Sequence, residues 1–472
     1  MAPDQPSTCI RLSLPLTFIA PLLQGFTSFS PDGRLVACAV AYRLIVRDTD
    51  HLQIVQIYSC VDAIDGVQWS FDSEYVLCSI SKRGVAQVWS VSNSEWHCKI
   101  DEGPVGLAHA RWSPDGRHVL AAADFNLRLT IWSLLDRSVY YIRFPKFARA
   151  GLDFTADGEL MALAERRDLK DSVAIVACDG WTPVRSFAVG TQDLADLKWS
   201  PRGRVLCAVD TALQYQVLIY TAAGEHLQTY RPYEDALGVK SFAWSPGGEM
   251  LAVGSYDERV RILNCVTWQR LAECEHPAEV GGSFAPSAVA WLEPVTEAPP
   301  ASLEPPEPGS VADLFPVSVS SDFATDRVAG YVARRMPLSV PELKPNLDMA
   351  NPKVGIGLAQ WSFDGRWLAT RNDNMPRAIW IWSSESFTVR SVLLQQQGVR
   401  AVAWHPSRPL LALCTGTSRV FMWSPAGCHT APLPPRHQFR VTELSWSPKG
   451  DTLLLLDKER FCLCFVGLSD SS

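Results

Sequence analysis

The 472-residue sequence lacks several patterns that mark common protein classes. It has no run of about 18 apolar residues, so we expect no membrane-spanning helix. Acidic residues outnumber basic ones, 50 to 43, and the net charge of −7 makes nucleic acid and an anionic membrane poor default partners. The N-terminal apolar stretch follows Asp4 and is interrupted by Arg11, Pro15 and Pro21, so we expect no secretion signal.

The thirteen cysteines lack the paired spacing of a metal or redox site, because no two of them form a CxxC pair. Cys38, Cys78, Cys207 and Cys414 lie inside apolar runs, where a free thiol packs as a small hydrophobic side chain. An odd number of scattered cysteines suits a reducing compartment, so we expect a cytoplasmic protein.

Catalytic and nucleotide-binding motifs are also missing, since the chain has no GxSxG elbow, Walker loop or HExxH helix. The segment VGIG at 354–357 lacks a third glycine and is interpreted as a loop. His97 with Cys98, and Cys462 with Cys464, have no second pair at metal-ligand spacing and are interpreted as strand residues. We therefore expect no enzyme, no cofactor and no metal site.

The sequence does contain a motif that occurs nine times, an aromatic residue followed by Ser-Pro-Asp-Gly or a close variant. Successive aromatic residues, the anchors, lie 40 to 45 residues apart, except for one gap of 117. A period of 40 to 45 residues is typical of WD repeats, each of which forms one four-stranded blade of a β-propeller. The nine anchors are Phe29, Trp69, Trp112, Phe154, Trp199, Trp244, Trp361, Trp404 and Trp446.

Each copy has the same internal order, which predicts strand, tight turn and strand, followed by a further strand about 20 residues after the anchor. In the third copy these are HVLAA at 118–122 and LTIWS at 129–133. The Gly-His pair of ordinary WD repeats is absent, and Trp-Ser replaces Trp-Asp in four copies. We therefore expect that the His-Asp-Ser-Trp hydrogen-bond network of ordinary blades cannot form in its usual arrangement.

Nine copies predict an all-β fold, a WD40-type β-propeller with a single closed ring of nine blades. Two separate propellers would have only four or five blades each, and a seven-bladed ring with two extra blades is the alternative. The last copy ends without a fourth strand. Residues 9–18, before the first anchor, could supply that strand and bring both chain ends into one blade.

The gap of 117 residues predicts an insert of about 74 residues at 277–350. It holds 12 of the 33 prolines, and its Pro/Glu-rich centre cannot pack a core, so we expect the insert to be largely flexible. Strand-like apolar patterns at 287–294 and 327–340 predict order near its two ends. The chain is thus divided into blades one to six with the N-terminal closing strand (1–276), the insert (277–350) and blades seven to nine (351–472).

Charged and amide residues are dense in three turns that lie between the second and third strands of their blades, at 164–171, 255–259 and 370–377. Propeller geometry places these turns on one face, and binding sites tend to lie on loops of a rigid scaffold. Ordinary solvated loops with internal salt bridges are the alternative. The partner-binding candidates are Glu165, Arg166, Arg167, Asp168, Asp257, Arg259, Arg371, Asn372, Asp373 and Asn374.

Several segments, among them EWHCKIDEG, LAVGSYDERVRILNCVTW and ANPKVGIG, are similar to the spindle-pole and centrosomal WD-repeat family. The resemblance runs from the first anchor to the last and fades in the Pro-rich insert. It implies a non-enzymatic scaffold that binds a coiled-coil adaptor of the Msd-one/SSX-interacting type, in some organisms with a minus-end-directed kinesin. It further implies a place in the cytoskeleton, at the centrosome, centriolar satellites and spindle pole, with roles in microtubule anchoring, mitotic spindle assembly and cilium biogenesis.

Two other functions are considered for such a propeller. Divergent nine-bladed rings with these anchors also resemble translation initiation factors that touch the ribosome, but the chain lacks a basic tail for RNA. A ubiquitin-ligase substrate receptor would carry a Trp-Asp-x-Arg docking box, which is absent.

Overall fold

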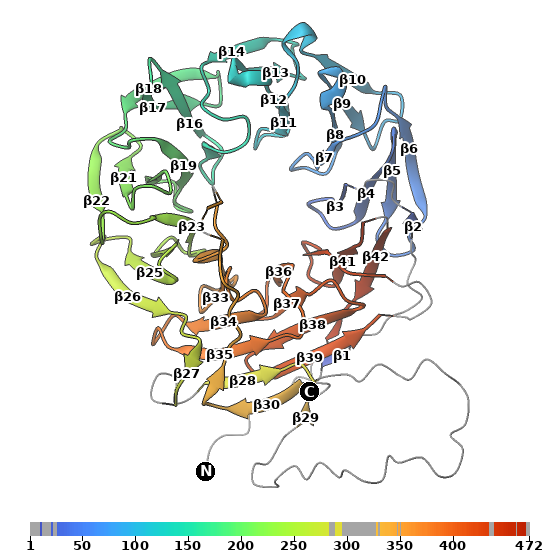
Figure 1. Cartoon of the computed structure of the whole chain (residues 1–472). Helices are drawn as coiled ribbons and strands as arrows, with labels where there is room; N and C mark the ends of the chain where they lie inside the picture. Colours follow the sequence, from blue (N-terminus) through green and yellow to red (C-terminus); the bar gives the residue numbers. More distant parts are fainter. Residues whose placement is uncertain are drawn as a thin grey trace.

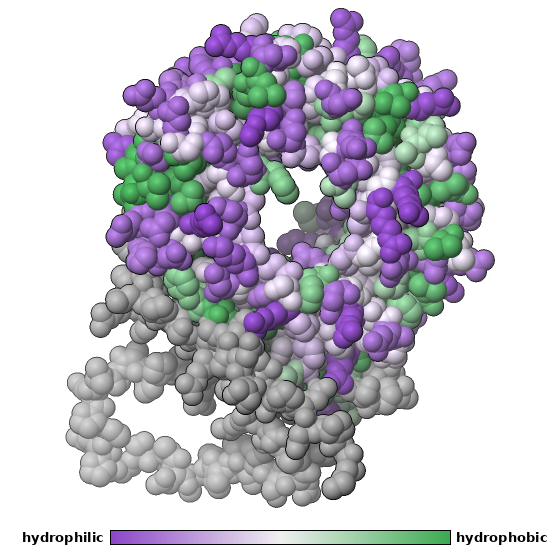
Figure 2. Space-filling view, turned by 180° about the vertical axis from the view of Figure 1, so that it is seen from behind, coloured by the Kyte–Doolittle hydropathy of each residue, from purple (hydrophilic) through white to green (hydrophobic). Residues whose placement is uncertain are grey.

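The computed structural model describes residues 10–11, 20–21, 26–282, 288–294, 327–328, 331–346, 348–349, 351–433, 439–458 and 460–468. These residues form nine blades around a central opening (Figure 1), which Figure 2 shows from the opposite side. Eight blades are four-stranded sheets and one belongs to a sheet of seven strands. The prediction of a single nine-bladed ring is confirmed, and the alternative of seven blades with two extra ones is wrong.

The first three blades follow one another along the chain, and each is an antiparallel meander whose first strand lies nearest the opening (Figure 1). Blade one contains β3 (Thr27–Phe29), β4 (Leu35–Val40), β5 (Arg43–Asp48) and β6 (Ile54–Ser59). Blade two contains β7 (Gly66–Trp69), β8 (Tyr75–Ile80), β9 (Val85–Ser90) and β10 (His97–Asp101). Blade three contains β11 (His109–Trp112), β12 (His118–Ala122), β13 (Arg128–Ser133) and β14 (Val139–Arg143).

Blades four to six repeat the same order. Blade four contains β15 (Leu152–Phe154), β16 (Leu160–Arg167), β17 (Lys170–Ala177) and β18 (Thr182–Ala188). Blade five contains β19 (Leu194–Trp199), β20 (Val205–Asp210), β21 (Val217–Thr221) and β22 (His226–Tyr230). Blade six contains β23 (Val239–Trp244), β24 (Met250–Ser255), β25 (Arg259–Asn264) and β26 (Arg270–Glu275).

The last three blades follow the insert. Blade seven contains β32 (Ile356–Trp361), β33 (Trp367–Asn372), β34 (Ala378–Ser383) and β35 (Val389–Leu394). Blade eight contains β36 (Ala401–Trp404), β37 (Leu411–Cys414), β38 (Arg419–Ser424) and β39 (Gly427–Pro432). Blade nine contains β40 (Glu443–Trp446), β41 (Thr452–Leu456), β42 (Arg460–Phe465) and the N-terminal β2 (Ala20–Pro21).

Helical structure in the described ranges is limited to short 3-10 turns, η1 (Ser81–Arg83), η2 (Gly103–Val105) and η3 (Asp124–Asn126). No helix found there has the length and apolar character needed to cross a lipid bilayer.

The Ser-Pro-Asp-Gly motif forms the turn between the first two strands of a blade. In blade three the Ser113 hydroxyl donates to the Asp115 carboxylate and accepts the backbone N–H of His118 at 3.2 Å. Gly116 closes the turn with φ +65°, a conformation that glycine adopts without a Cβ penalty. In blade two Ser73 takes this position at φ +64°. The motif therefore ends one strand and begins the next at a fixed place. In blade eight the His405 imidazole accepts the N–H groups of this turn.

The anchor tryptophans hold neighbouring blades together. Trp112 Nε1 donates to the carbonyl oxygen of Gln68 in the first strand of blade two, at 3.1 Å. Four further anchors make the same bond to the preceding blade, namely Trp69, Trp361, Trp404 and Trp446. An aromatic ring also buries a large apolar area. Such an anchor therefore fills the interface between two blades and forms a hydrogen bond across it.

Apolar side chains of the middle strands fill the spaces between blades. The predicted thiols belong to this core, because Cys38, Cys78, Cys207 and Cys414 are each at most 1% exposed. The twelve cysteines of the described residues are free thiols. The prediction that these four cysteines pack as hydrophobic side chains is confirmed.

Blade seven assembles three parts of the hydrogen-bond network of ordinary WD repeats, whose usual arrangement we expected not to form. Trp382 Nε1 donates to the Thr370 hydroxyl at 2.8 Å, and that hydroxyl lies 2.7 Å from His276 Nε2. His276 Nδ1 lies 3.0 Å from the carbonyl oxygen of Glu258. In blade three the Glu102 carboxylate accepts the Trp132 indole N–H at 2.7 Å and the Thr130 hydroxyl at 3.0 Å. The Gly-His pattern misses the blade-seven contacts because His276 follows Glu275 rather than glycine.

Blade nine is completed by the N-terminal part of the chain. β2 pairs antiparallel with β42, with Ala20 opposite Phe461. This strand lies two residues beyond the predicted segment 9–18, so the predicted position of the closing strand is corrected to Ala20–Pro21. Within the predicted segment, β1 (Ile10–Arg11) pairs instead with β43 (Gly467–Leu468), outside the blade. The first described strands of the chain therefore pair with its last two strands, β42 and β43.

Described parts of the insert extend blade seven. β28 (Val289–Leu292) pairs in parallel with the outer strand β35, β30 (Tyr331–Arg335) pairs with β28, and β29 (Arg327–Val328) pairs with β30. β27 (Glu279–Val280) pairs with β31 (Leu338–Ser339). The segments 287–294 and 327–340, where the sequence predicts order, supply most of these strands, and Trp291 and Tyr331 pack in the core between blades seven and eight. Residues 295–326, which include the Pro/Glu-rich centre, lie outside the described residues.

Candidate functional site

The three charge-dense turns connect the second and third strands of blades four, six and seven. In an antiparallel four-stranded meander, this turn and the connection to the next blade lie at the same end of the strands. We call this side of the ring the turn face. The candidate residues therefore gather on one face, although their surroundings differ from blade to blade.

In blade four, Arg166 belongs to an ion network with residues between blades. Lys146 Nζ lies 2.8 Å from Asp171 and 2.6 Å from Asp193, and the Lys146 side chain is 5% exposed. Arg166 Nη1 lies 2.8 Å from Asp193. The hydrogen bond from Lys146, together with both positive charges, lowers the pKa of the Asp193 carboxyl. Arg166 is thus partly accessible and already paired.

The rest of the blade-four turn is more open. Glu165 is buried, which raises the pKa of its carboxyl, and Arg167 Nη2 lies 3.4 Å from it. The Arg167 side chain is 58% exposed. Asp168 and Leu169 form the tip of the hairpin, both with positive φ, and Leu169 is 85% exposed. Arg167 and Asp168 are therefore accessible to a partner.

In blade six, the candidates take part in a row of ion pairs along β25 and β26. Asp257 lies 2.6 Å from Arg261, and Arg259 contacts Glu273 and lies 3.0 Å from Glu275. Arg261 is buried, whereas Arg259 is exposed. Arg259 is the candidate that a partner could reach here.

The four candidate residues of the blade-seven turn are buried or half-buried, which argues against a solvated loop at these positions. Asn372 and Asn374 are 0% and 5% exposed. Arg371 pairs with Asp373 at 3.2 Å, and Asp373 also pairs at 2.8 Å with Lys240 of blade six, whose side chain is 8% exposed. These residues hold blade six against blade seven. Charge density in a short segment does not reveal such burial, because the neighbouring cation comes from a distant part of the chain.

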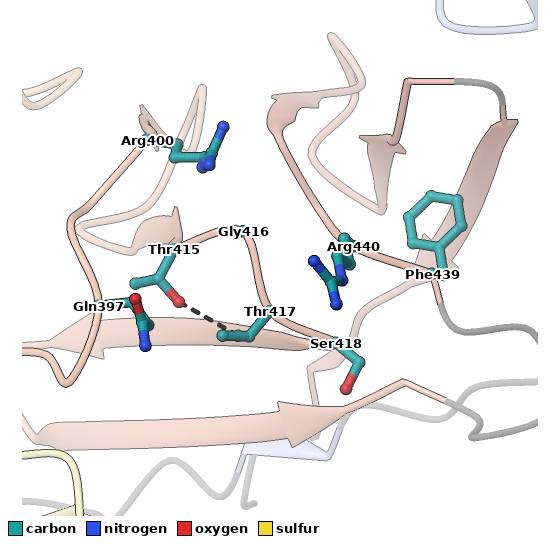
Figure 3. A pocket seen from close by; sticks show the side chains of 8 residues that line it. All are labelled: Gln397, Arg400, Thr415, Gly416, Thr417, Ser418, Phe439 and Arg440. Carbon is teal, nitrogen blue, oxygen red and sulfur yellow. Dashed lines mark hydrogen bonds between the residues drawn. The ribbon is translucent and has the colours of Figure 1, made fainter.

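A cavity on the turn face of blade eight was missed by the sequence analysis. Its volume is about 610 Å³, within the usual range of ligand sites. It lies at the turn between β37 and β38 and is bounded by the connections on both sides of the blade. Figure 3 shows its lining, which consists of Gln397, Arg400, Thr415, Gly416, Thr417, Ser418, Phe439 and Arg440.

The cavity combines two arginines with hydroxyl groups. Arg400 and Arg440 approach the Gly416 turn from opposite sides (Figure 3), and both are exposed. Thr415 is 4% exposed, and its hydroxyl lies 3.1 Å from that of Thr417. Gly416 has φ +81°, and a Cβ there would lie 2.6 Å from Arg400 Nε. A glycine is therefore needed for the Arg400 side chain to lie across this turn.

One carboxylate, that of Asp457, lies beside this cavity. In the described part of the chain, neither Arg400 nor Arg440 has a carboxylate at ion-pair distance. Asp457 and Lys458 line an adjoining cavity of about 230 Å³, whose lining also includes Arg400, Gly416 and Arg440. The Asp457 carboxylate accepts the backbone N–H groups of Arg440 and Lys458, at 3.3 and 2.6 Å. This carboxylate is thus occupied by backbone N–H groups, and the guanidinium groups of Arg400 and Arg440 form no ion pair with a described residue.

The sequence signal for this cavity was weak. Its turn reads Thr-Gly-Thr-Ser at 415–418 and, unlike the candidate turns, contains no charged residue. Arg400 and Arg440 are contributed by the connections before and after the blade. Only the packing of blades brings the three segments together. Among the described residues, no group of three or more His, Cys, Asp or Glu side chains could hold a metal ion.

Comparisons with known proteins agree with the fold. The family "WD domain, G-beta repeat" matches residues 224–264, from the end of blade five to the third strand of blade six. An uncharacterized WD repeat-containing protein of Schizosaccharomyces pombe is 22% identical over 67% of this chain and 58% of its own length. The crystal structure of the C-terminal WD40 domain of Sif2 superposes with a TM-score of 0.50 at 10% identity, covering 98% of this chain and 100% of that domain.

A closer relative covers nearly the whole chain. WD repeat-containing protein WRAP73 of Mus musculus is 46% identical over 442 residues, which is 93% of this chain and 93% of the mouse protein. The chain therefore belongs to the family of WD-repeat propeller proteins that includes mouse WRAP73.

Proposed function

We propose that this protein is a non-enzymatic scaffold of the centrosome and spindle pole that binds a coiled-coil adaptor and helps to anchor microtubule minus ends. The observation that carries the proposal is the 46% identity to WRAP73 over 93% of the chain. It supports the resemblance to the spindle-pole and centrosomal WD-repeat family noted in the sequence. A rigid ring with polar turns on one face suits a scaffold, since binding residues are commonly held on loops of a stable framework.

The adaptor docks on the turn face in this proposal. The accessible candidates are Arg167, Asp168 and Arg259, which lie on blades four and six. Arginine pairs bidentately with carboxylates and still stacks on planar groups, so these residues suit a helical partner rich in acidic and amide side chains. A minus-end-directed kinesin would join the complex through the adaptor, and the complex would support spindle assembly and cilium formation from the centrosome and centriolar satellites.

Imaging tests the cellular part of the proposal. The fluorescently tagged full chain is expected to concentrate at centrosomes in interphase and at spindle poles in mitosis. The same cells, lysed and fractionated on sucrose gradients, are expected to show no co-sedimentation with polysomes. Polysome association without centrosomal signal would instead favour a propeller of the initiation-factor type.

Charge reversal tests the docking face. Arg167→Glu combined with Arg259→Glu is expected to weaken adaptor capture at least tenfold while the melting temperature stays unchanged, because exposed ion pairs add about 0–1 kcal/mol to stability. Arg185→Glu, on the outer strand β18, is the matched control and should bind normally. Normal binding by the folded double variant would place the adaptor elsewhere on the ring.

A further inference from the structure

The blade-eight cavity differs in its charges from the candidate turns of blades four and seven. Lys146, beside the blade-four turn, and Lys240 of blade six, beside the blade-seven turn, are buried and paired with aspartates at 2.6 to 2.8 Å. Arg400 and Arg440 instead line an open cavity of about 610 Å³ and have no carboxylate partner in the described residues. A concave site with two unpaired guanidinium groups attracts an anion, because the walls of a cleft focus its potential.

We propose that this cavity binds a phosphorylated serine or threonine of a protein partner. A phosphate monoester carries a charge of about −1.5 to −2 at pH 7 and has three acceptor oxygens. Two guanidinium groups balance that charge, whereas a single carboxylate would leave one of them unpaired. Arginine binds phosphate oxygens bidentately, so groups on opposite sides of the Gly416 turn can hold the anion between them (Figure 3).

The hydroxyl groups supply further donors at the floor of the cavity. The Thr415 and Thr417 hydroxyls form one hydrogen bond with each other at 3.1 Å, which uses one of their two hydrogens. The other hydrogen remains available for a phosphate oxygen. Ser418 and the Gln397 amide add donors at the rim. Glycine at position 416 leaves room for the Arg400 side chain beside these hydroxyls, because a Cβ there would lie 2.6 Å from Arg400 Nε.

Other anionic ligands fit the cavity less well. A nucleotide base needs an accessible aromatic or apolar surface for stacking, and Phe439 is only 2% exposed. Nucleic acid backbones require a stripe of cations rather than two in one pocket, and the chain carries a net charge of −7. A membrane surface is flat, whereas these arginines line a recess. A phosphorylated side chain that projects from a peptide can enter such a recess. This inference does not depend on the proposed centrosomal function.

Direct binding tests the proposal with the full chain. The probes are fluorescein-labelled peptide mixtures with a central phosphothreonine, the same mixtures with unmodified threonine, inorganic phosphate, and phosphatidylserine-containing vesicles. Fluorescence anisotropy is expected to show binding of the phosphorylated mixture at least tenfold tighter than the unmodified one. Inorganic phosphate should compete with it, and binding should weaken as salt increases. Equal binding of both mixtures, or binding of the vesicles alone, would overturn the proposal.

Substitutions locate the site. Arg400→Gln with Arg440→Gln is expected to remove the phosphate-dependent part of binding, since one charge-assisted contact contributes about tenfold or more. Arg377→Gln is the matched control, because Arg377 is an exposed arginine near the turn of the neighbouring blade seven. Thr417→Val should weaken phosphopeptide binding and leave the melting temperature unchanged. This variant tests the site if the double arginine variant does not fold. An equal loss in the Arg377 variant, or unchanged binding in both site variants, would contradict the assignment.

Discussion

The hydrogen bonds around His276 require a neutral imidazole. Nδ1 donates to the Glu258 carbonyl, so Nε2 is the acceptor that receives the Thr370 hydroxyl, and this hydroxyl in turn accepts the Trp382 indole N–H. A proton on Nε2 would leave the Thr370 hydroxyl without its acceptor. Burial lowers the pKa of His276 to about 4. The residue therefore stays uncharged in the folded ring at neutral pH.

His276 gives the ring a predictable sensitivity to acid. An unfolded histidine has a pKa of about 6.5, so between about pH 6.5 and 4 the unfolded state binds one proton more than the folded state. Stability is expected to decrease as pH falls through this window. The free energy of unfolding can be measured by urea titration at several values between pH 7 and 4.5. It should decrease less steeply with falling pH for His276→Gln than for the unsubstituted chain. His51→Gln, at an exposed site, is the control and should behave like the unsubstituted chain. Parallel profiles for all three proteins would contradict this account.

Charge reversal at Arg371 should destabilise the fold rather than affect only binding. Arg371 donates to the Val399 carbonyl at 2.8 Å and pairs with Asp373. A glutamate there would face Asp373 and leave that carbonyl without its donor, at a cost of about 2–4 kcal/mol. We expect a lower melting temperature for Arg371→Glu and an unchanged one for Arg377→Glu, measured by differential scanning fluorimetry. Equal melting temperatures would show that the pair is dispensable.

The sequence repeat predicts contacts within a blade better than contacts between blades. The turn at Ser113 and Gly116 follows from local chemistry, because both residues are close in sequence to the groups they contact. The burial of Asn372 depends on another blade, as does the cavity between Arg400 and Arg440. A period gives the number and order of the blades, but it does not say which polar side chains meet across a seam.

At the scale of secondary structure elements, the short strand β2 protects the edge of β42. An uncovered strand edge presents unpaired N–H and C=O groups to other chains. Removal of residues 1–21 is expected to lower the melting temperature and to cause self-association, detected by light scattering. Removal of residues 1–9, which leaves β1 and β2 intact, should have neither effect. A monomeric protein with an unchanged melting temperature after the longer deletion would show that β2 is not needed for closure.

The insert combines a structural part with a part that we expect to be dispensable. Trp291 and Tyr331 pack between blades seven and eight, and the Gln395 side chain donates to the Tyr331 hydroxyl at 2.5 Å. Replacing residues 296–325 by a short Gly/Ser linker should leave the melting temperature unchanged, because loop length changes closure entropy only slightly. Removing residues 277–350 should lower it by exposing that core. Limited proteolysis should cut first within 295–315, and protection of this stretch would contradict the prediction.

At the scale of the whole molecule, the order of blades around the ring is independent of where the chain begins. Ile10 pairs with Leu468, so the two ends of the described chain lie next to each other. A circular permutant that joins these ends by a short linker and opens the chain within 300–320 is expected to fold into the same ring. Its circular dichroism and melting temperature should match those of the original chain. Failure to fold would mean that the order of synthesis matters for closure.

The anchor tryptophans also place a built-in optical probe at the seams between blades. Indole emission shifts to longer wavelength when water reaches the ring, and the Trp69, Trp112 and Trp361 side chains are at most 8% exposed. Each of them donates its indole N–H to the blade before it, so the separation of two blades would break that bond and wet the ring together. Intrinsic fluorescence can therefore report local opening of the propeller before the strands themselves unfold, and single anchor substitutions to phenylalanine would identify which seam opens first.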